Sequence, residues 1–255
     1  EMGYVSVGHD LIYGLPKQSV SDIEDTIEKT KALRPDRIAL YSYAHVPWKK
    51  GNGQRGFKDT DLPSPERKRR QYEVAKKRLL EAGYVEIGMD HFALPHDHLY
   101  RAAEVGTLHR NFMGYTASKT QLLIGLGASS IGDSWYGYAQ NVKSVEEYQH
   151  LVDNGIMPIY RGHVLTQKDQ VIRRHILNLM CRFETAWPNE TLQFEELDRV
   201  LDRLGVMQSD GLIKIHERGL QIVRKGKPFV RNICMMFDAY LHGTASDKKQ
   251  FSMTV

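Results

Sequence analysis

The first ninety residues alternate between short apolar runs and amphipathic segments, and this alternation limits the possible fold more than any other feature of the chain. Three β-rich runs are predicted as strands, at 5–13, 37–43 and 84–89. The segments 21–33 and 64–82 between them have helical patterns, with a capping box at the start of the first and proline at the first position of the second. This order predicts βαβ units in a parallel sheet, and both a doubly wound sheet and a piece of a (β/α) barrel remain open.

Near residue 144 the alternation gives way to helical patterns. Helices are predicted to begin at Ser144, at Thr166 and at about Thr191, and a β-hairpin is predicted over 211–223. A last helix follows Pro228. Helices followed by a hairpin resemble a winged-helix unit, but a fold does not determine a function, and no focused basic recognition helix is present. We therefore expect a structural cap, and we predict two domains, at 1–143 and 144–255.

Composition and cysteine usage narrow the possible classes of protein. The net charge is +4, and no apolar run approaches the roughly 18 residues that a membrane span requires. The first residues lack the pattern of a signal peptide, so we expect a cytoplasmic protein without a membrane or nucleic-acid partner. Cys181 and Cys234 lie in apolar helical patterns, where buried thiols are usual. No CxxC or CxxxCxxC spacing occurs, so the chain alone does not supply three thiolates to a metal cluster.

Polar side chains occur where each predicted strand ends, and they mark a candidate ligand site. They are Asp10 in the first strand, the segment 43–45 after the second and Asp90-His91 after the third. In α/β sheets and barrels, ligands bind at the carboxyl ends of the strands. A carboxylate inside an apolar strand is costly unless it is paired or bound to a ligand. Asp10 is therefore either an acceptor for a ligand hydroxyl or ammonium group or one half of a salt bridge.

Two further segments carry groups that bind ligands. The segment 109–115 combines a guanidinium with two aromatic rings, so Arg110 could bind a carboxylate and Phe112 could stack on a ring; the alternative is a loop that these side chains stabilise. The segment 125–132 resembles a dinucleotide-binding loop, but Ser130 stands in place of the third glycine, and a tight turn is preferred. Hydrolase triads, HExxH and Walker motifs are absent from the sequence.

Taken together, five segments resemble the oxygen-independent coproporphyrinogen III oxidases and occur in the same order. They are DLIYGLPKQ (10–18), YAHVP (43–47), GMDHFA (88–93), LHRNF (108–112) and RNICM (231–235). The resemblance covers essentially the whole chain and corresponds to roughly the C-terminal half of the family's length. Haem chaperones of the same superfamily share the DLIYGLP segment but carry an HNxxYW-like motif, which residues 109–112 do not match. The oxidase branch is therefore favoured, with a haem chaperone and a winged-helix nucleic-acid-binding module as the alternatives.

The resemblance implies an α/β fold, namely the C-terminal portion of a partial (β/α) radical-SAM barrel followed by a mostly helical domain. Family members hold a [4Fe–4S] cluster on three cysteines and bind two molecules of S-adenosylmethionine. A 5′-deoxyadenosyl radical then abstracts hydrogen from substrate propionates, which lose carbon dioxide and become vinyl groups. The substrate is coproporphyrinogen III and the product is protoporphyrinogen IX, in haem biosynthesis. A complete protein of this kind is expected to be a monomer.

The resemblance also assigns cofactor-binding residues by position. Five residues match positions near S-adenosylmethionine: Asp10, Ala44, Phe112, Met113 and Ile131. Met113 departs from the glutamine often found there, and a thioether does not replace an amide's donor and acceptor. The cluster belongs to the family's N-terminal half, which this chain does not contain, so no metal ligand and no catalytic residue is expected here. The chain alone is expected to be inactive.

Overall fold

The computed structural model describes residues 3–48 and 53–243, and contacts divide these into two compact units. Unit 1 comprises the described residues up to Glu104, and unit 2 runs from Val105 to Gly243. The sequence suggested a boundary after residue 143, so the division by contacts falls earlier. The physical reason is that the segment after Val105 packs against later helices: the Tyr115 hydroxyl donates a hydrogen bond of 2.9 Å to the backbone oxygen of Met180.

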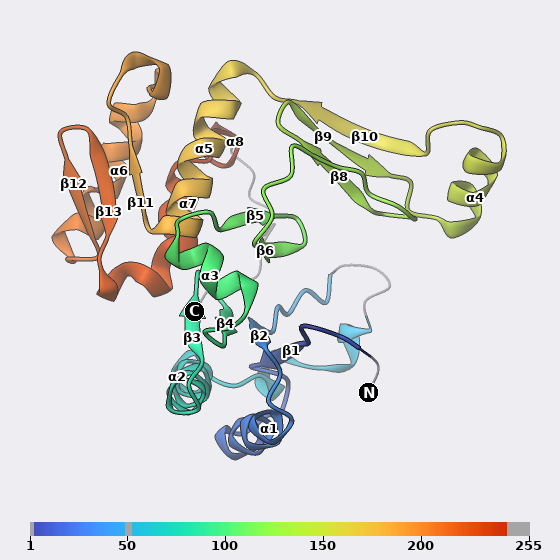
Figure 1. Cartoon of the computed structure of the whole chain (residues 1–255), viewed down its shortest axis with the longest axis vertical. Helices are drawn as coiled ribbons and strands as arrows, with labels where there is room; N and C mark the ends of the chain where they lie inside the picture. Colours follow the sequence, from blue (N-terminus) through green and yellow to red (C-terminus); the bar gives the residue numbers. More distant parts are fainter. Residues whose placement is uncertain (1–2, 49–52, 244–255) are drawn as a thin grey trace. The chain divides into compact units, whose positions relative to one another are not determined.

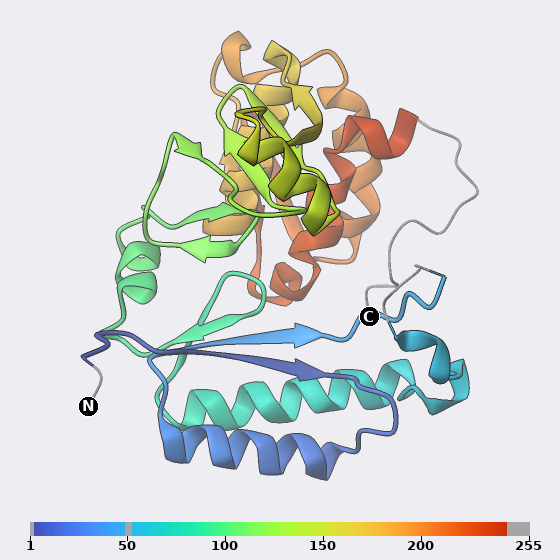
Figure 2. The ribbon, with the colours of Figure 1, turned by 90° about the vertical axis from the view of Figure 1, so that its right-hand side faces the viewer.

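Unit 1 is a four-stranded sheet with two long helices on one face (Figures 1 and 2). Its elements are β1 (Gly8–Tyr13), α1 (Val20–Leu33), β2 (Arg37–Ser42), α2 (Pro65–Glu81), β3 (Val85–Ile87), β4 (His91–Ala93) and α3 (His98–Glu104), with 3-10 turns at Gln54–Gly56 and Asp59–Asp61. The strand order is β1-β2-β4-β3. Only β1 and β2 pair in parallel, while β4 is antiparallel to both β2 and β3.

The first two predicted strands pair in parallel as expected. The third, β3, also runs in their direction, because it is antiparallel to β4, which is antiparallel to β2; it does not pair with β2, because the unpredicted β4 lies between them. The predicted strand 84–89 is shorter, ends at Ile87 and turns directly into β4, which takes the place beside β2. Residues 88–90 form this turn, and Gly88 adopts a φ of 62°. A connection this short joins antiparallel strands only, because a parallel pair needs a crossover of a dozen or more residues.

Alternate strand residues of unit 1 face the two helices. Leu11 and Tyr13 of β1 and Ile38 and Leu40 of β2 pack toward α1 and α2. The buried cluster is Ile23, Ile27, Ile38, Leu40, Tyr72, Ala75, Leu79, Tyr84, Phe92 and Leu94. Helix α2 begins at Ser64-Pro65 as predicted, whereas α1 is capped by Ser19, which forms a capping box with Asp22. The predicted capping box therefore lies two residues too late.

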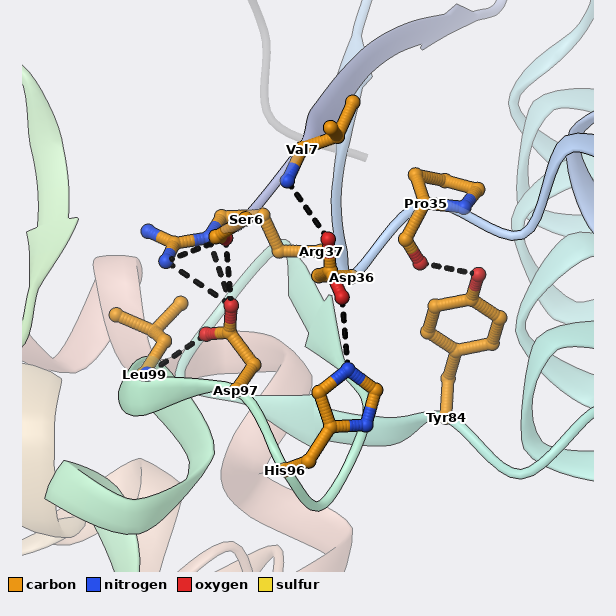
Figure 3. Close-up of polar contacts among 9 residues, drawn as sticks. All are labelled: Ser6, Val7, Pro35, Asp36, Arg37, Tyr84, His96, Asp97 and Leu99. Carbon is orange, nitrogen blue, oxygen red and sulfur yellow. Dashed lines mark hydrogen bonds and ion pairs between the residues drawn. The ribbon is translucent and has the colours of Figure 1, made fainter. Parts of the chain in front are cut away.

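A buried polar network lies at the end of this sheet where β1 and β2 begin (Figure 3). The fully buried Asp97 carboxylate accepts hydrogen bonds from Ser6 at 2.9 Å, from the Arg37 guanidinium at 3.0 and 3.2 Å, and from the Leu99 amide at 2.7 Å. Beside it, hydrogen bonds from His96 and from a backbone amide lower the pKa of Asp36. The network lies where β1 and β2 begin, away from the edge at which ligands bind in such sheets, so we assign it to stability.

Unit 2 contains three antiparallel sheets and the helices α4 to α8. The elements are β5 (His109–Asn111), β6 (Gly114–Thr116), β7 (Leu122–Leu123), β8 (Ile131–Ser134), β9 (Gly137–Asn141), α4 (Val145–Asp153), β10 (Ile159–Val164), α5 (Gln167–Arg182), β11 (Glu184–Ala186), α6 (Leu197–Ser209), β12 (Ile213–His216), β13 (Gly219–Ile222), α7 (Val230–Met236) and α8 (Ala239–Gly243). The sheets have the orders β10-β9-β8-β7, β5-β6 and β11-β13-β12. Figure 1 shows α4 at the far end of the β8–β10 sheet, away from α5.

The helical predictions for unit 2 are confirmed at several starts. Ser144 caps α4, Thr166 caps α5 with a capping box to Asp169, and the hairpin 211–223 is present as β12 and β13. The helix expected from Thr191 is wrong at its start, because a 3-10 turn precedes α6, which begins at Leu197. No helix in the described part of the chain is long and apolar enough to cross a bilayer.

His175 of α5 occupies the core of unit 2 as a neutral group. Its Nδ1 lies 2.8 Å from the Thr185 hydroxyl oxygen and its Nε2 lies 2.9 Å from the Leu192 carbonyl oxygen. A carbonyl only accepts, so Nε2 carries the proton. Burial lowers the pKa of His175. This side chain therefore joins α5 to β11 and to the segment before α6.

Candidate active site

In unit 1, the sheet face opposite the helices carries the candidate ligand groups. The strand register places Asp10 beside Ala39, and Ala39 beside His91, in one row across β1, β2 and β4. The rings of Tyr41 and His91 lie 6.0 Å apart, edge to face, and Nδ1 of His91 lies 2.5 Å from the Asp90 carboxylate. This face of the sheet therefore carries a carboxylate, an imidazole and an aromatic ring.

Asp10 lies in the middle of β1, although we expected it at the end of a strand. Its side chain is exposed, and within the described residues its carboxylate has no hydrogen-bonding or ionic partner. The salt-bridge interpretation therefore finds no support within this part of the chain. An exposed carboxylate can accept hydrogen bonds from the hydroxyl or ammonium groups of S-adenosylmethionine, so Asp10 fits a role in binding that cofactor.

Ala44 follows the carboxyl end of β2, in a loop that hydrogen bonds hold in place. The side-chain amide of Gln54 donates to the Ala44 carbonyl at 3.1 Å and accepts from the Val46 amide at 2.6 Å. The Lys68 ammonium donates to the Tyr43 carbonyl at 3.0 Å, and burial lowers the pKa of Lys68. A small residue in a fixed loop leaves room for a ligand to approach the backbone, as the predicted role of Ala44 requires.

In unit 2, a cavity of about 460 Å³ opens between the β5–β6 turn, β8–β10 and α5. It is lined by Arg110, Asn111, Phe112, Asp133, Tyr138, His163, Leu165, Asp169, Ile172, Arg173, Ile176, Leu177, Asp238, Ala239 and Tyr240. The volume falls in the range of small-molecule sites. A lining that is mostly apolar, with a few charged groups, is also typical of such sites.

One wall of the cavity is built around Arg173 of α5. Its guanidinium donates to the Asp133 carboxylate at 2.7 Å and to the Ser134 carbonyl at 2.6 Å. The same group lies 5.2 Å from the ring centres of both Trp135 and Tyr138. Both partners of the ion pair are mostly buried, which fixes the guanidinium on β8. Burial raises the pKa of Tyr138, so its hydroxyl stays protonated at neutral pH.

The remaining predicted cofactor residues all lie in unit 2. Phe112 lines the cavity, is 54% exposed and packs edge to face on Tyr138 at 5.2 Å between ring centres. Met113 is 82% exposed, and its amide donates to the Asn111 side chain. Ile131 begins β8, is half-buried and does not line this cavity. The structure thus brings Phe112 to a cavity, leaves Met113 at the surface and does not bring Ile131 to the cavity.

The described residues do not fit an iron–sulfur cluster. Cys181 is half-buried and Cys234 is buried, and burial raises their pKa values to about 11 and about 12. Thiols with such pKa values stay protonated at neutral pH, whereas cluster ligands are thiolates. Across residues 3–48 and 53–243, no three His, Cys, Asp or Glu side chains gather as a metal site would need.

Several cavity residues were not found from the sequence. Arg110 and Phe112 stand in a dense motif, but Arg173 looks like any basic residue of an amphipathic helix. Its partner Asp133 lies 40 positions earlier in the chain, so no local spacing links the two. The sequence around Tyr138, in the middle of β9, carries no motif that indicates a binding site either. Only folding brings these three side chains together.

The chain is similar to known proteins both in sequence and in structure. Proteins named oxygen-independent coproporphyrinogen III oxidase are 40% identical to this chain in Salmonella typhimurium, over all of it, and 40% identical in Pseudomonas aeruginosa, over 99% of it. A solved structure, described as coproporphyrinogen III oxidase (HemN) from Escherichia coli and as a radical SAM enzyme, matches 94% of the chain with a TM-score of 0.86 and 39% identity. No family model matches the chain.

These similarities concern first the fold and then the sequence. The chain has the α/β fold of a radical SAM enzyme. Along its whole length the chain is similar in sequence to oxygen-independent coproporphyrinogen III oxidases, which confirms the resemblance found in its motifs. Neither the haem chaperone nor the nucleic-acid-binding alternative is favoured. The chain spans about half the length of the curated relatives it matches, 56% of the Salmonella protein and 55% of the Pseudomonas protein.

Proposed function

We propose that this chain is the C-terminal part of an oxygen-independent coproporphyrinogen III oxidase. The proposed reaction removes two propionate carboxyl groups of coproporphyrinogen III as carbon dioxide and leaves two vinyl groups, giving protoporphyrinogen IX in haem biosynthesis. The observation that carries the proposal is the identity of about 40% along the whole chain to proteins of that name. The exposed and unpaired Asp10 carboxylate agrees with it.

When bound, S-adenosylmethionine supplies the carbon radical for this chemistry, together with a [4Fe–4S] cluster held by a segment outside this chain. The residues of the chain bind and orient the cofactor. Asp10 accepts hydrogen bonds from polar groups of S-adenosylmethionine, and the Ala44 loop packs beside it. Phe112 and Met113 contact a second molecule, and Ile131 packs on an adenosine. The rings and aliphatic side chains around Phe112 exclude water from the reacting propionate.

The finer architecture is part of the same proposal. The β1–β2 pair with α1 and α2 is a portion of a (β/α) barrel, and α5, α6 and α7 with the β11-β13-β12 sheet form a winged-helix-like cap. Residues 1–143 would then be the barrel portion with its extension, and 144–255 the helical domain. The complete enzyme is a cytoplasmic monomer without a nucleic-acid or membrane partner.

The chain by itself is expected to assemble no [4Fe–4S] cluster, because its two thiols are half-buried and buried and the described residues gather no set of three ligands. Anaerobic incubation with iron and sulfide, followed by iron analysis and a visible spectrum, measures this directly. A stoichiometric cluster on this chain would contradict the proposal that a segment outside this chain holds the cluster. A longer polypeptide that includes a CxxxCxxC segment is the positive control.

Asp10→Asn is expected to raise the Kd for S-adenosylmethionine about tenfold in the polypeptide that also contains the cluster segment, because the amide loses the charge that strengthens each hydrogen bond. Isothermal titration calorimetry measures the affinity. Asp25→Asn is the matched control, since Asp25 is an exposed helix residue paired with Lys29. If Asp10→Asn binds as tightly as the parent protein, Asp10 is not a cofactor ligand.

A further inference from the structure

Arg110 of β5 is a partly buried cation without a counter-ion in the described part of the chain. Its guanidinium lies over the Tyr115 ring, 4.6 Å from the ring centre. Its Nη1 atom is buried and has no hydrogen-bond partner. A guanidinium that is removed from water without an acceptor is unfavourable, and most buried donors in proteins are satisfied. The side chain lines the cavity of unit 2, where a ligand can supply the acceptor.

The three carboxylates that line the same cavity are already engaged. Asp133 pairs with Arg173 at 2.7 Å. Asp169 accepts hydrogen bonds from the Thr166 amide and hydroxyl at 2.9 and 2.8 Å, at the start of α5. Asp238 accepts from two backbone amides at the start of α8, at 3.0 and 3.1 Å. None of the three is paired with Arg110, so its positive charge remains available to an anionic ligand.

The rest of the cavity suits a flat ring that carries such an anion. Phe112 and Tyr138 present two aromatic rings set edge to face, and Ile172, Ile176 and Leu177 add aliphatic surface. A guanidinium binds a carboxylate through two parallel hydrogen bonds, a geometry that a lysine cannot reproduce. A pyrrole ring with a propionate arm has both required features, and the cavity of about 460 Å³ holds part of a tetrapyrrole.

We propose that Arg110 binds a propionate carboxylate of the tetrapyrrole substrate in the cavity of unit 2, with the attached pyrrole ring against Tyr138 and the aliphatic side chains of α5. This assignment rests on the proposed function and adds to it the residue that recognises the substrate's charge. Arg110 binds and positions the substrate, and no step of bond cleavage is assigned to it. Arg173 supports the site indirectly, because its guanidinium is held by Asp133 and keeps β8 and α5 together.

The test is a fluorescence titration of the chain with coproporphyrin III, the stable oxidised tetracarboxylate, and with its tetramethyl ester. Arg110→Met is expected to raise the Kd for coproporphyrin III at least tenfold and to leave the Kd for the ester unchanged, because the ester has no carboxylate. Arg110→Lys keeps the charge but loses the paired donors, so an intermediate loss is expected. Arg199→Met, an exposed position on α6, should bind like the parent chain.

Equal loss of both ligands in Arg110→Met would overturn the inference, because the effect would then not depend on the carboxylate. Unchanged coproporphyrin III binding in that variant, or no saturable binding by the parent chain, would overturn it as well. If Arg110→Met does not fold, as judged by circular dichroism, Arg110→Lys decides the question by the same comparison of acid and ester. The proposed function is judged separately, by decarboxylation of coproporphyrinogen III in the cluster-containing protein, so the two can fail independently.

Discussion

Replacing Asp97 by alanine is expected to destabilise unit 1 by about 3 kcal/mol, the lower end for breaking a buried ion pair by removing one partner. The Asp97 carboxylate is fully buried, whereas the Arg37 side chain is 34% exposed and can recover part of its hydration. The Leu99 amide and the Ser6 hydroxyl lose an acceptor at the same time. Figure 3 shows that a single carboxylate joins the start of β2 to the start of α3.

Hydrogen exchange measured by mass spectrometry reports this loss separately for the peptides of each unit. Exchange in peptides of β1, β2 and α3 should accelerate in Asp97→Ala, while peptides of unit 2 keep their protection. Asp25→Ala is the matched control, because it removes an exposed ion pair within α1, and such pairs contribute only about 0.5 kcal/mol or less. A loss in Asp97→Ala as small as in this control would contradict the assigned role.

The double variant Arg37→Met/Asp97→Ala separates the ion pair from the other contacts of Asp97. Replacing both members of a buried pair removes the uncompensated charge that the single change leaves behind. The double variant is therefore expected to lose less stability than the sum of the two single losses. Simple addition of the two losses would show that Arg37 and Asp97 are not energetically coupled.

Gly226→Ala is expected to destabilise unit 2 by about 3 kcal/mol, because the new methyl group has no room. A Cβ atom at Gly226 would lie 2.0 Å from the Leu212 carbonyl oxygen and 3.0 Å from the Ile222 side chain. The carbonyl cannot yield easily, because it accepts the Val223 amide at 3.1 Å next to the β12–β13 hairpin. Relief of the clash would separate the turn Arg224–Phe229 from this hairpin.

Gly205→Ala tests the same substitution in open space. Gly205 lies inside α6, and apart from the adjacent residues and nearby backbone of its own helix a Cβ there meets no atom within 4 Å. Alanine is favoured over glycine in a helix interior by about 1 kcal/mol, so this variant is expected to be slightly more stable than the parent chain. Urea unfolding followed by circular dichroism measures both variants. A Gly226→Ala protein as stable as the parent would show that the turn repacks without cost.

Local chemistry made much of the fold predictable. Ser64-Pro65, Ser144 and Thr166 begin helices because their side chains accept hydrogen bonds from the first free backbone amides, an interaction within four residues. The hairpin 211–223 was equally visible, because alternating apolar residues and its turn are local signals. The family motifs were readable for the same reason, and the similarity of the whole chain to known proteins confirmed them.

The sheet of unit 1 shows where local signals end. The apolar run 84–89 predicts a strand correctly. Which strand pairs with it, however, depends on residues that are far apart in the chain. His91, Phe92 and Ala93 pair with β2, some fifty residues earlier in the chain, and so displace β3 to the edge. Strand pairing is set by tertiary packing of both faces, which no short window of sequence contains.

By itself, the sequence determined the starts of α2, α4 and α5, the parallel β1–β2 unit, the lack of a cluster-binding cysteine motif and the resemblance to the oxidases, because each depends on neighbouring residues or on an ordered series of motifs. Tertiary structure alone decided that Asp10 faces away from the helices and that Asp133 neutralises Arg173. It also decided that Arg110 has no counter-ion in the described cavity. Charge compensation depends on distances through space, and folding sets these between residues that are remote in the chain.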